Sequence, residues 1–341
     1  MREAGVRTIV DASRLAVVGL VEVLGHIPQI YREYRRLVAA ARIEEPELAI
    51  LVDSPDFHLR LARRLGTMGI PVVYLVAPQA WAWRHGRVRT MRRNLERLLC
   101  IFPFEEAFFS SRGVAATFIG HPLAGLVRPK LTRSEFFRKH RLAAGRPLIT
   151  ILPGSRKGEA ARHLPPLLAA VDRLYGERAA NFVLPASVTT GARFFEELIG
   201  DAPIRVIEGE NWDAIAHADL ALAASGTVTV EAALLGTPMV AFYKVTGLSW
   251  FLGRFLVRVP HYSMVNLIAG RALVPELMQS AMTGERLAAE ARVLLDDTAA
   301  RERMRRGLAE VAQKLAGPGD AIEHASAIIQ DLMEGKVAHV S

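Results

Sequence analysis

The sequence predicts an α/β protein with two domains, each built on a parallel sheet. The chain has 341 residues, whereas a single hydrophobic core stops growing at about 250–300 residues. Short apolar runs alternate with longer amphipathic stretches, which is the rhythm of strand–helix–strand units with right-handed crossovers. This rhythm occurs twice, on either side of a charged, proline-containing stretch at about residues 121–146.

The predicted strands are runs of Val, Ile, Leu and Phe without polar alternation, which is typical of strands buried on both faces. The first series is Leu48–Val52, Val72–Val76, Leu98–Phe102 and Ala115–Ile119. The second series is Leu148–Leu152, Phe182–Pro185, Ile204–Ile207, Leu220–Ala223 and Met239–Phe242. Amphipathic stretches such as Phe57–Gly69 separate the strands and predict helices.

The chain is expected to be helical after Thr283, with helices at Leu287–Leu295 and Arg301–Leu315. After the break at residues 317–319, Asp320 is a predicted N-cap with Glu323 three residues later. The last helix should present one apolar face, made of Ile322, Ala325, Ile329 and Leu332. We therefore expect domains at 1–125 and 126–310, and C-terminal helices at 311–341 that pack back toward the first domain.

The composition points to an anionic partner. Lys and Arg number 43 against 35 Asp and Glu, a net charge of +8. Such a surface suits nucleic acid, an acidic membrane or a phosphorylated substrate, but no nucleic-acid-binding motif accompanies the charge.

The one cysteine, Cys100, cannot form an internal disulfide, which fits a reducing cytoplasm. No signal peptide and no transmembrane run of about 18 apolar residues is visible.

Two carboxylates follow the first predicted strand, at Asp53 and Asp56. The carboxyl ends of strands in open α/β sheets face the ligand crevice, so a carboxylate there is a candidate general base. The alternative is that Asp56 or Asp53 caps the following helix.

A loop with two tryptophans, Trp81-Ala82-Trp83-Arg84, follows the next strand. The tryptophan rings either stack on a sugar or acyl chain or pack under the loop.

An arginine run continues from this loop. It consists of Arg84, Arg87, Arg89, Arg92, Arg93 and Arg97. Such a run is either a solvated helix face or a contact with phosphate or a membrane.

The second half contains two candidate anion-binding turns. Gly154-Ser155-Arg156 follows the first strand of that half, where glycine lets backbone amides approach an anion and arginine adds charge. Ser225-Gly226-Thr227 follows a later strand, and Glu231 stands one helical turn beyond, where it could accept both hydroxyls of a ribose. The alternatives are a plain glycine turn in the first case, and in the second a Thr227 or Ser225 cap with Glu231 on a solvated face.

Two polar residues and one apolar stretch complete the candidates. Asn266 and Gln279 stand in apolar surroundings and bond either a ligand or loop backbone. The stretch Leu15–Ile27 is apolar nearly all round and is followed by Arg32, Arg35 and Arg36, which suits a membrane interface. A buried core helix is the alternative. The predicted membrane-contacting residues are Val17, Val18, Leu20, Val21, Val23, Leu24 and Ile27.

Several absences narrow the chemistry. No Asp-x-Asp follows a strand in a metal-binding setting, no Cys or His cluster has ligand spacing, and Gly-x-Ser-x-Gly is missing. Metal chemistry and serine hydrolysis are therefore disfavoured, and no metal or cofactor is expected.

Taken together, these segments resemble the lipid-A-disaccharide synthases, inverting nucleotide-sugar transferases of glycosyltransferase family 19 with the GT-B fold. Each motif is weak alone, but eight in family order over nearly the whole chain argue against chance. They are Leu15–Gly25, Asp53–Phe57, Trp81–Arg84, Phe102–Glu105, Phe118–Pro122, Leu152–Arg156, Ala224–Thr227 with Glu231, and Asn266–Arg271.

The resemblance implies two Rossmann-like domains whose parallel sheets face each other across a cleft. The first domain would hold the acceptor and touch the membrane, and the second would hold the UDP-sugar. Asp53 falls on the family's proposed general base, Arg156 on an arginine facing the nucleotide diphosphate, and Glu231 at the ribose. The implied substrate-binding residues are Gly154, Ser155, Ser225, Gly226, Thr227, Glu231, Asn266, Gln279, Trp83 and Arg84.

The implied reaction joins the glucosamine of UDP-2,3-diacylglucosamine to 2,3-diacylglucosamine-1-phosphate (lipid X), giving lipid A disaccharide-1-phosphate and UDP. It is a single inverting displacement with no covalent intermediate. The implied location is cytoplasmic, on the anionic inner face of the inner membrane of a Gram-negative-type bacterium. A homodimer is left open.

One departure from the family pattern concerns the start of the chain. The family normally opens with a strand and a Gly-Glu-x-Ser-Gly-Asp loop before the Met-x-x-x-Gly stretch seen at Met1–Gly5. We expect roughly 45 residues, including the first strand of the N-terminal domain, to be missing, which would expose two neighbouring strand edges.

Three other functions are compatible with parts of the pattern. Another GT-B enzyme that uses a UDP-sugar, such as a UDP-N-acetylglucosamine 2-epimerase or the transferase of the peptidoglycan lipid precursor, would share the nucleotide-side features. An inactive membrane-associated UDP-binding fragment would share them too. The Trp81–Arg84 loop and the Leu15–Gly25 stretch favour the lipid A enzyme.

Overall fold

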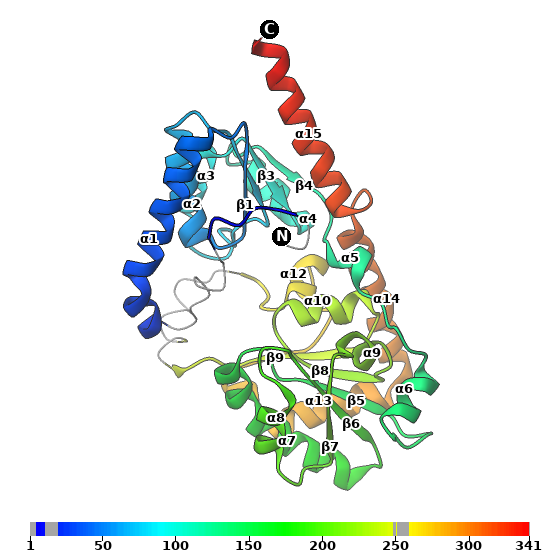
Figure 1. Ribbon diagram of the computed structural model, residues 1–341. Helices are drawn as coiled ribbons and strands as arrows, with labels where there is room; N and C mark the ends of the chain where they lie inside the picture. The colour runs from blue at the N-terminus through cyan, green and yellow to red at the C-terminus, as the bar shows by residue number, and fades with distance from the viewer. Residues whose placement is uncertain (1–4, 11–19, 248–249, 251–258, 341) are drawn as a thin grey trace. The chain divides into compact units, whose positions relative to one another are not determined.

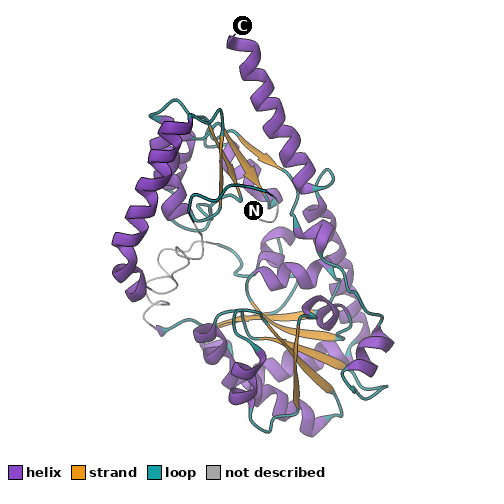
Figure 2. Ribbon diagram, in the orientation of Figure 1, coloured by secondary structure: helices purple, strands orange, loops and turns teal. Residues whose placement is uncertain are grey.

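The computed structural model describes residues 5–10, 20–247, 250 and 259–340 (Figure 1). The chain forms two compact units. The first unit comprises Met1–Ile119 and Ile322–Ser341, and the second comprises Gly120–Ala321. Each unit carries its own parallel sheet with helices packed against it (Figure 2), so the predicted α/β class with two parallel sheets is confirmed.

The sheet of the first unit has four parallel strands in the order β1-β2-β3-β4. The strands are β1 (Ala49–Val52), β2 (Val72–Leu75), β3 (Arg97–Cys100) and β4 (Ala116–Phe118). All four predicted strands are therefore confirmed, with ends that differ by one or two residues. Because the four strands are parallel, the loops that follow them all emerge at one edge of the sheet.

Five helices of this unit are described: α1 (Leu20–Glu44), α2 (Pro55–Gly66), α3 (Arg87–Asn94), α4 (Pro103–Ser110) and α15 (Ala321–Val340). α1 contacts α2, and α2 contacts α3. The core lies between α2 and the sheet, where Leu59 and Leu65 of α2 meet Tyr74, Leu98 and Cys100. These side chains recur at helical spacing on α2 and on alternate strand positions, as an amphipathic helix on a sheet requires.

Strand β1 differs from the prediction. Leu51 is buried, but Ile50 and Val52 are each 48% exposed. Successive side chains of a strand point to opposite faces, so β1 buries the face toward α2 and leaves the other face half exposed. The expectation of burial on both faces is wrong for this strand, because α2 packs against one face of β1 and the other face stays half exposed.

The predicted apolar face of the last helix is also partly wrong. Ala321 and Ala325 of α15 are buried, whereas Ile322 is 52% exposed. A helix turns by about 100° per residue, so residues four apart share a face and Ile322 lies beside it.

The sheet of the second unit has six parallel strands in the order β10-β9-β8-β5-β6-β7. The strands are β5 (Leu148–Leu152), β6 (Asn181–Ala186), β7 (Ile204–Glu208), β8 (Leu220–Ala224), β9 (Met239–Tyr243) and β10 (Glu276–Met278). Five were predicted and are confirmed, whereas β10 was not recognised. The chain starts in the middle at β5, runs outward to β7, and returns to β8 on the other side of β5. Ligands of such sheets bind where the strand order reverses, beyond the carboxyl ends of the two central strands.

Helices cover both faces of this sheet (Figure 2). α7 (Lys157–Glu177), α8 (Ala192–Ile199) and α13 (Gly284–Asp296) lie on one face, and α9 (Asn211–Ala216), α10 (Thr227–Leu234) and α12 (Met264–Ala269) lie on the other. The remaining helices are α5 (Leu123–Leu126), α6 (Arg133–Lys139), the 3₁₀ helix η3 (Gln279–Ala281) and α14 (Thr298–Ala316). α7 and α13 approach so closely that a Cβ on Gly284 would lie 2.5 Å from Cβ of Ala169.

Within the described residues, no helix combines the length and the apolar character needed to cross a membrane.

Candidate active site

Asp53 occupies a tight turn between β1 and α2. Asp53 and Ser54 both have a φ of 51°, and both are exposed. Ser54 is the N-cap of α2 and makes no side-chain capping bond. The interpretation of Asp53 or Asp56 as the helix cap is therefore wrong. The Asp53 carbonyl accepts hydrogen bonds from His58 Nδ1 at 2.7 Å and from the Tyr74 hydroxyl.

Asp56 joins α2 to the tryptophan loop. Its Oδ1 accepts hydrogen bonds from Arg84 Nη1 at 2.7 Å and from Arg87 Nη2. Both guanidinium groups also lie over the Trp83 ring, at 4.3 and 5.5 Å from its centroid. Asp56 in the first turn of α2 thus holds Arg84 in place, and Arg84 in turn packs over Trp83.

Trp81 packs inside the protein. Its ring meets Phe104 edge-on with centroids 4.9 Å apart, and its Nε1 donates to Glu105 Oε1 at 3.0 Å. Of the two alternatives for the tryptophans, packing under the loop therefore holds for Trp81. Glu105 was not recognised as a functional candidate because its partner lies 24 residues away in the sequence.

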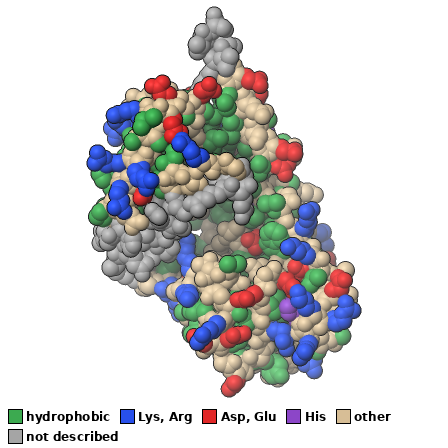
Figure 3. All heavy atoms as spheres, viewed as in Figure 1, with side chains coloured by type: hydrophobic (Ala, Val, Ile, Leu, Met, Phe, Trp, Pro, Cys, Tyr) green, Lys and Arg blue, Asp and Glu red, His purple; other side chains and the backbone are tan. Residues whose placement is uncertain are grey.

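The arginine run divides into two groups. Arg84 and Arg87 are paired with Asp56, and Arg97 donates to Thr117 Oγ1 at 3.3 Å. Arg89, Arg92 and Arg93 of α3 are exposed, and none has a carboxylate partner within the described part of the chain. Lys and Arg side chains are visible over the helices of the first unit in Figure 3.

A pocket of about 220 Å³ in the second unit lies beyond the carboxyl ends of β5 and β8, where the strand order reverses. Six predicted substrate-binding residues line it: Gly154, Ser155, Ser225, Gly226, Thr227 and Glu231. Pro185 at the end of β6, Ser187 just after it, and Asn211 at the start of α9 also line the pocket. Arg156 follows Ser155 but is exposed and does not line the pocket.

Gly154 is required by its surroundings. Its φ is +113°, and a Cβ there would lie 2.7 Å from Oε2 of Glu159. The Glu159 carboxylate bonds to the Tyr243 side chain, so its position is fixed from β9. A non-glycine residue would be strained at this position for both reasons.

His163 of α7 holds the loop that follows β5 through backbone hydrogen bonds. It is fully buried, and its Nδ1 donates to the Pro153 carbonyl at 2.8 Å while its Nε2 accepts from Lys244 N at 2.9 Å. Burial lowers the pKa of His163, so the ring is neutral. The sequence reading missed this residue because both partners are backbone atoms.

The structure also contradicts the alternatives for the Ser225–Thr227 turn and for Glu231. Gly226 is the N-cap of α10 without a side-chain capping bond, and Ser225 Oγ donates to the Tyr262 carbonyl at 2.9 Å. The capping interpretation of Ser225 or Thr227 is therefore wrong. Burial raises the pKa of Glu231, which a hydrogen bond from Trp212 partly offsets. Glu231 consequently does not lie on a solvated face.

Asn266 of α12 is buried, and its side chain bonds to the segment that connects α12 to β10 and to Glu276 at the start of β10. Its Oδ1 accepts from the backbone N–H groups of Leu273 and Val274 at 2.8 and 2.9 Å. Its Nδ2 donates to the Val274 carbonyl at 2.9 Å and to Glu276 Oε1 at 2.8 Å. These contacts favour the second of its two alternatives, which is satisfying loop backbone.

Gln279 makes a similar contact. In the amide orientation that satisfies both groups, it bonds to the Val245 carbonyl at 3.3 Å and to the Val245 N–H at 3.1 Å. Neither Gln279 nor Asn266 lines the 220 Å³ pocket, and their substrate-binding roles stay predictions.

Much of the predicted membrane segment lies outside the described residues, including Val17 and Val18. Helix α1 begins at Leu20 and contains Leu20, Val21, Val23 and Leu24. Ile27 is 49% exposed, and the membrane contact of this segment stays a prediction.

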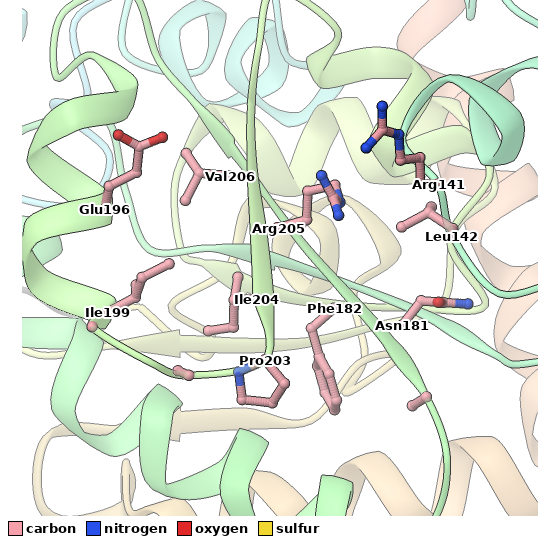
Figure 4. Close-up of a pocket in the computed structure, with 13 residues that line it drawn as sticks. Arg141, Leu142, Asn181, Phe182, Glu196, Ile199, Pro203, Ile204, Arg205 and Val206 are labelled. Carbon is pink, nitrogen blue, oxygen red and sulfur yellow. The ribbon is translucent and has the colours of Figure 1, made fainter.

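Two larger hollows lie at the opposite end of the second sheet. One of about 510 Å³ is bordered by the beginnings of β6 and β7, with Arg141, Arg205 and Glu196 at its rim (Figure 4). The other, of about 1190 Å³, lies before β5 and β8. Neither contains a predicted site residue, and both lie at amino ends of strands, away from the usual ligand edge. In the described ranges, no group of three His, Cys, Asp or Glu side chains could hold a metal ion.

Comparison with known proteins identifies the family. A model of the lipid-A-disaccharide synthetase family matches residues 1–325. The lipid-A-disaccharide synthase of Solibacter usitatus is 70% identical over 341 residues, which cover all of this chain and 90% of that protein. The lipid-A-disaccharide synthase of Anaeromyxobacter sp. is 43% identical over 334 residues, or 96% of this chain and 87% of that protein.

A solved structure shares the fold. The UDP-GlcNAc 2-epimerase of Methanocaldococcus jannaschii in complex with UDP-GlcNAc and UDP aligns with a TM-score of 0.57 over 89% of this chain and 81% of that chain. Because the two sequences are only 13% identical, this structural likeness shows a shared fold and nothing about function. Sequence identity to the lipid-A-disaccharide synthases is far higher, so the comparisons do not favour the epimerase or the peptidoglycan-precursor transferase. The chain therefore belongs to the lipid-A-disaccharide synthetase family.

Proposed function

We propose that the chain condenses UDP-2,3-diacylglucosamine with lipid X to form lipid A disaccharide-1-phosphate and UDP. The observation that carries this proposal is the pocket at the switch point of the second sheet, considered together with the family. Backbone amides and hydroxyls from two glycine turns line it, and one half-buried carboxylate, Glu231, lies at its side. Such a set suits a nucleoside diphosphate, because amides and hydroxyls bind phosphate oxygens and a carboxylate accepts ribose hydroxyls.

On the donor side, the turns at Gly154-Ser155 and Ser225-Thr227 would bind the diphosphate. As the sugar–phosphate bond breaks, negative charge grows on the departing UDP. Donors fixed in advance stabilise that charge more than they stabilise the ground state. Arg156 follows Ser155 and is exposed, so its guanidinium can turn toward the same phosphates and add charge.

On the acceptor side, Asp53 would act as general base. Its carboxylate takes the proton from the 6-hydroxyl of lipid X while that oxygen attacks the anomeric carbon of the donor. The new carbon–oxygen bond forms on the face opposite the breaking bond to UDP, and UDP leaves with the bonding electrons. One displacement of this kind inverts the anomeric carbon and gives a β-1,6 linkage.

The acyl chains of both substrates place the reaction at a membrane, and we propose peripheral contact with an anionic inner leaflet. Three exposed arginines without carboxylate partners, Arg89, Arg92 and Arg93, support this on α3, within the described residues. Polybasic segments gain about 1 kcal/mol per Lys or Arg near an anionic surface. The exposed Ile27 of α1 supplies apolar area on the same unit.

The test is an assay of the purified chain with both lipid substrates in mixed micelles. Formation of disaccharide-1-phosphate with equimolar UDP is the expected result. UDP-N-acetylglucosamine alone should be returned unchanged; its epimerisation would contradict the proposal. Binding of UDP and flotation with anionic vesicles, without any product, would instead favour the inactive membrane-associated fragment.

A further inference from the structure

The Asp53 turn has an unusual backbone. β1 ends at Val52 and α2 begins at Pro55, so two residues make the whole connection. Asp53 and Ser54 both have a φ of 51°, in the left-handed region that residues with a Cβ rarely adopt. Pro55 adds a further restriction, since proline disfavours helical dihedrals in the residue before it. A turn of this kind persists only where surrounding contacts hold it.

Two side chains from different elements meet at the Asp53 carbonyl oxygen. His58, one turn into α2, donates from Nδ1 at 2.7 Å, and Tyr74 of β2 donates from its hydroxyl. The rings of His58 and Tyr74 also pack edge to face, with centroids 6.4 Å apart. The carbonyl is thus fixed from the helix and from the sheet at once.

The Tyr74 donor is itself immobile. Tyr74 is fully buried in the core between α2 and the sheet. Burial, and then the nearby charge of Asp53, raise the pKa of Tyr74, so its hydroxyl keeps its proton. The Asp53 N–H is also held, because it donates to the Leu75 carbonyl at 3.1 Å.

The Asp53 carboxylate, in contrast, makes no hydrogen bond to any group in the part of the chain that the structure describes. The backbone of the residue is therefore fixed at both its N–H and its carbonyl, while the exposed side chain is available to a substrate hydroxyl. This is the arrangement that a general base needs, since its rate contribution depends on correct placement.

We propose that Tyr74 and His58 are positioning residues for the transfer reaction, because they hold the strained Asp53–Ser54 turn through the Asp53 carbonyl. This inference rests on the proposed role of Asp53 as general base. Neither side chain contacts substrate in this proposal. Both act through the backbone of Asp53, and they set the direction in which its carboxylate points.

The test compares Tyr74→Phe with Tyr34→Phe in the assay for disaccharide formation. The first variant removes the hydroxyl that bonds Asp53. The second removes a hydroxyl from a tyrosine packed against the same core, whose ring meets Phe57 with centroids 6.0 Å apart. Tyr74→Phe should lower kcat by roughly 10- to 100-fold, because a misplacement of about 1 Å can cost that much. KM for both substrates should stay within about twofold, and Tyr34→Phe should match the parent protein.

A second variant separates positioning from simple destabilisation. Glycine at position 54 adopts a φ of 51° without strain, so Ser54→Gly should lower the strain that the turn must bear without Tyr74. The double variant Tyr74→Phe with Ser54→Gly should regain a large part of the lost kcat. A lowered kcat that Ser54→Gly does not restore would overturn the proposal, and so would a rise in KM with kcat unchanged.

The role of Asp53 is checked in the same assay with Asp53→Asn. If that variant keeps the parent activity, the general-base assignment fails. If it is inactive while Tyr74→Phe has the parent kcat, only the positioning inference fails. Near-ultraviolet circular dichroism of every variant confirms that the core around Tyr74 is folded.

Discussion

Trp81 Nε1 donates a hydrogen bond of 3.0 Å to Oε1 of Glu105, a carboxylate that is 1% exposed. The other oxygen of Glu105 accepts from the Phe102 N–H at 3.1 Å. One buried acid thus ties the loop after β2 to the start of α4. Burial raises the pKa of Glu105 to about 7, although the bonds from Trp81 and from the backbone oppose the shift.

A pH dependence of stability follows from this pair. In the folded chain Glu105 keeps its proton up to about pH 7, whereas an unfolded glutamate releases it near pH ~4.3. The stability that this group contributes is therefore fully present below pH ~4.3 and is lost as the pH rises toward 7. Glu105→Gln should remove that pH dependence, which is on the order of 3 kcal/mol across the interval. Urea unfolding of the parent and the variant at pH 5 and pH 7.5 measures the difference, and equal pH slopes would show that Glu105 titrates normally.

Asp53→Asn should lower kcat by about 10²–10⁴, the usual contribution of general acid–base catalysis. Asparagine has the same shape but cannot accept the proton of the acceptor hydroxyl. UDP binding, measured by calorimetry, should stay close to that of the parent protein, because no UDP-pocket residue has changed. A loss of UDP binding with an unchanged kcat would place Asp53 on the nucleotide side.

Glu231→Gln should weaken UDP binding by roughly 10- to 100-fold, since a hydrogen bond to a charged group contributes about 1.5–3 kcal/mol. UMP should lose the same factor as UDP if the carboxylate binds ribose, whereas inorganic pyrophosphate binding should be unaffected. Glu196→Gln is a matched control, because Glu196 is an exposed acid of the same unit outside the 220 Å³ pocket. Equal losses for pyrophosphate and UMP would contradict the ribose assignment.

Asn266→Ala should destabilise the second unit. The substitution leaves the buried N–H groups of Leu273 and Val274 without their acceptor, at a cost of about 1–3 kcal/mol each. A drop in melting temperature of about 5 °C or more is expected for a unit of this size. Asn94→Ala, which removes one bond to the Thr90 carbonyl, should lower it much less. If Asn266→Ala melts like the parent but binds substrate poorly, its main role is at the substrate and not in the loop.

The strands could be predicted because their apolar runs are local signals that recur in a regular rhythm. β10 was missed for the opposite reason. It has three residues, begins with Glu276, and follows Pro275, so neither its length nor its pattern marks a strand. Its pairing with β9 is a tertiary effect that no single segment of sequence contains.

The candidate site was predictable to the extent that its residues follow strands. Ser155 and Ser225 stand 70 positions apart in the sequence, yet the order of β5 and β8 in the sheet brings both to one pocket. Contacts made through backbone atoms left no such signal. His163 binds Pro153 and Lys244 through their main chains, and any residues at those positions would offer the same groups.

The half-exposed face of β1 has a consequence for handling the protein. β1 bonds to β2 on one side only, within the described residues, and it carries Ile50 and Val52 outward. An outer strand with apolar side chains is a template on which another polypeptide can extend the sheet. Concentrated solutions of this chain should therefore be prone to intermolecular strand addition at β1.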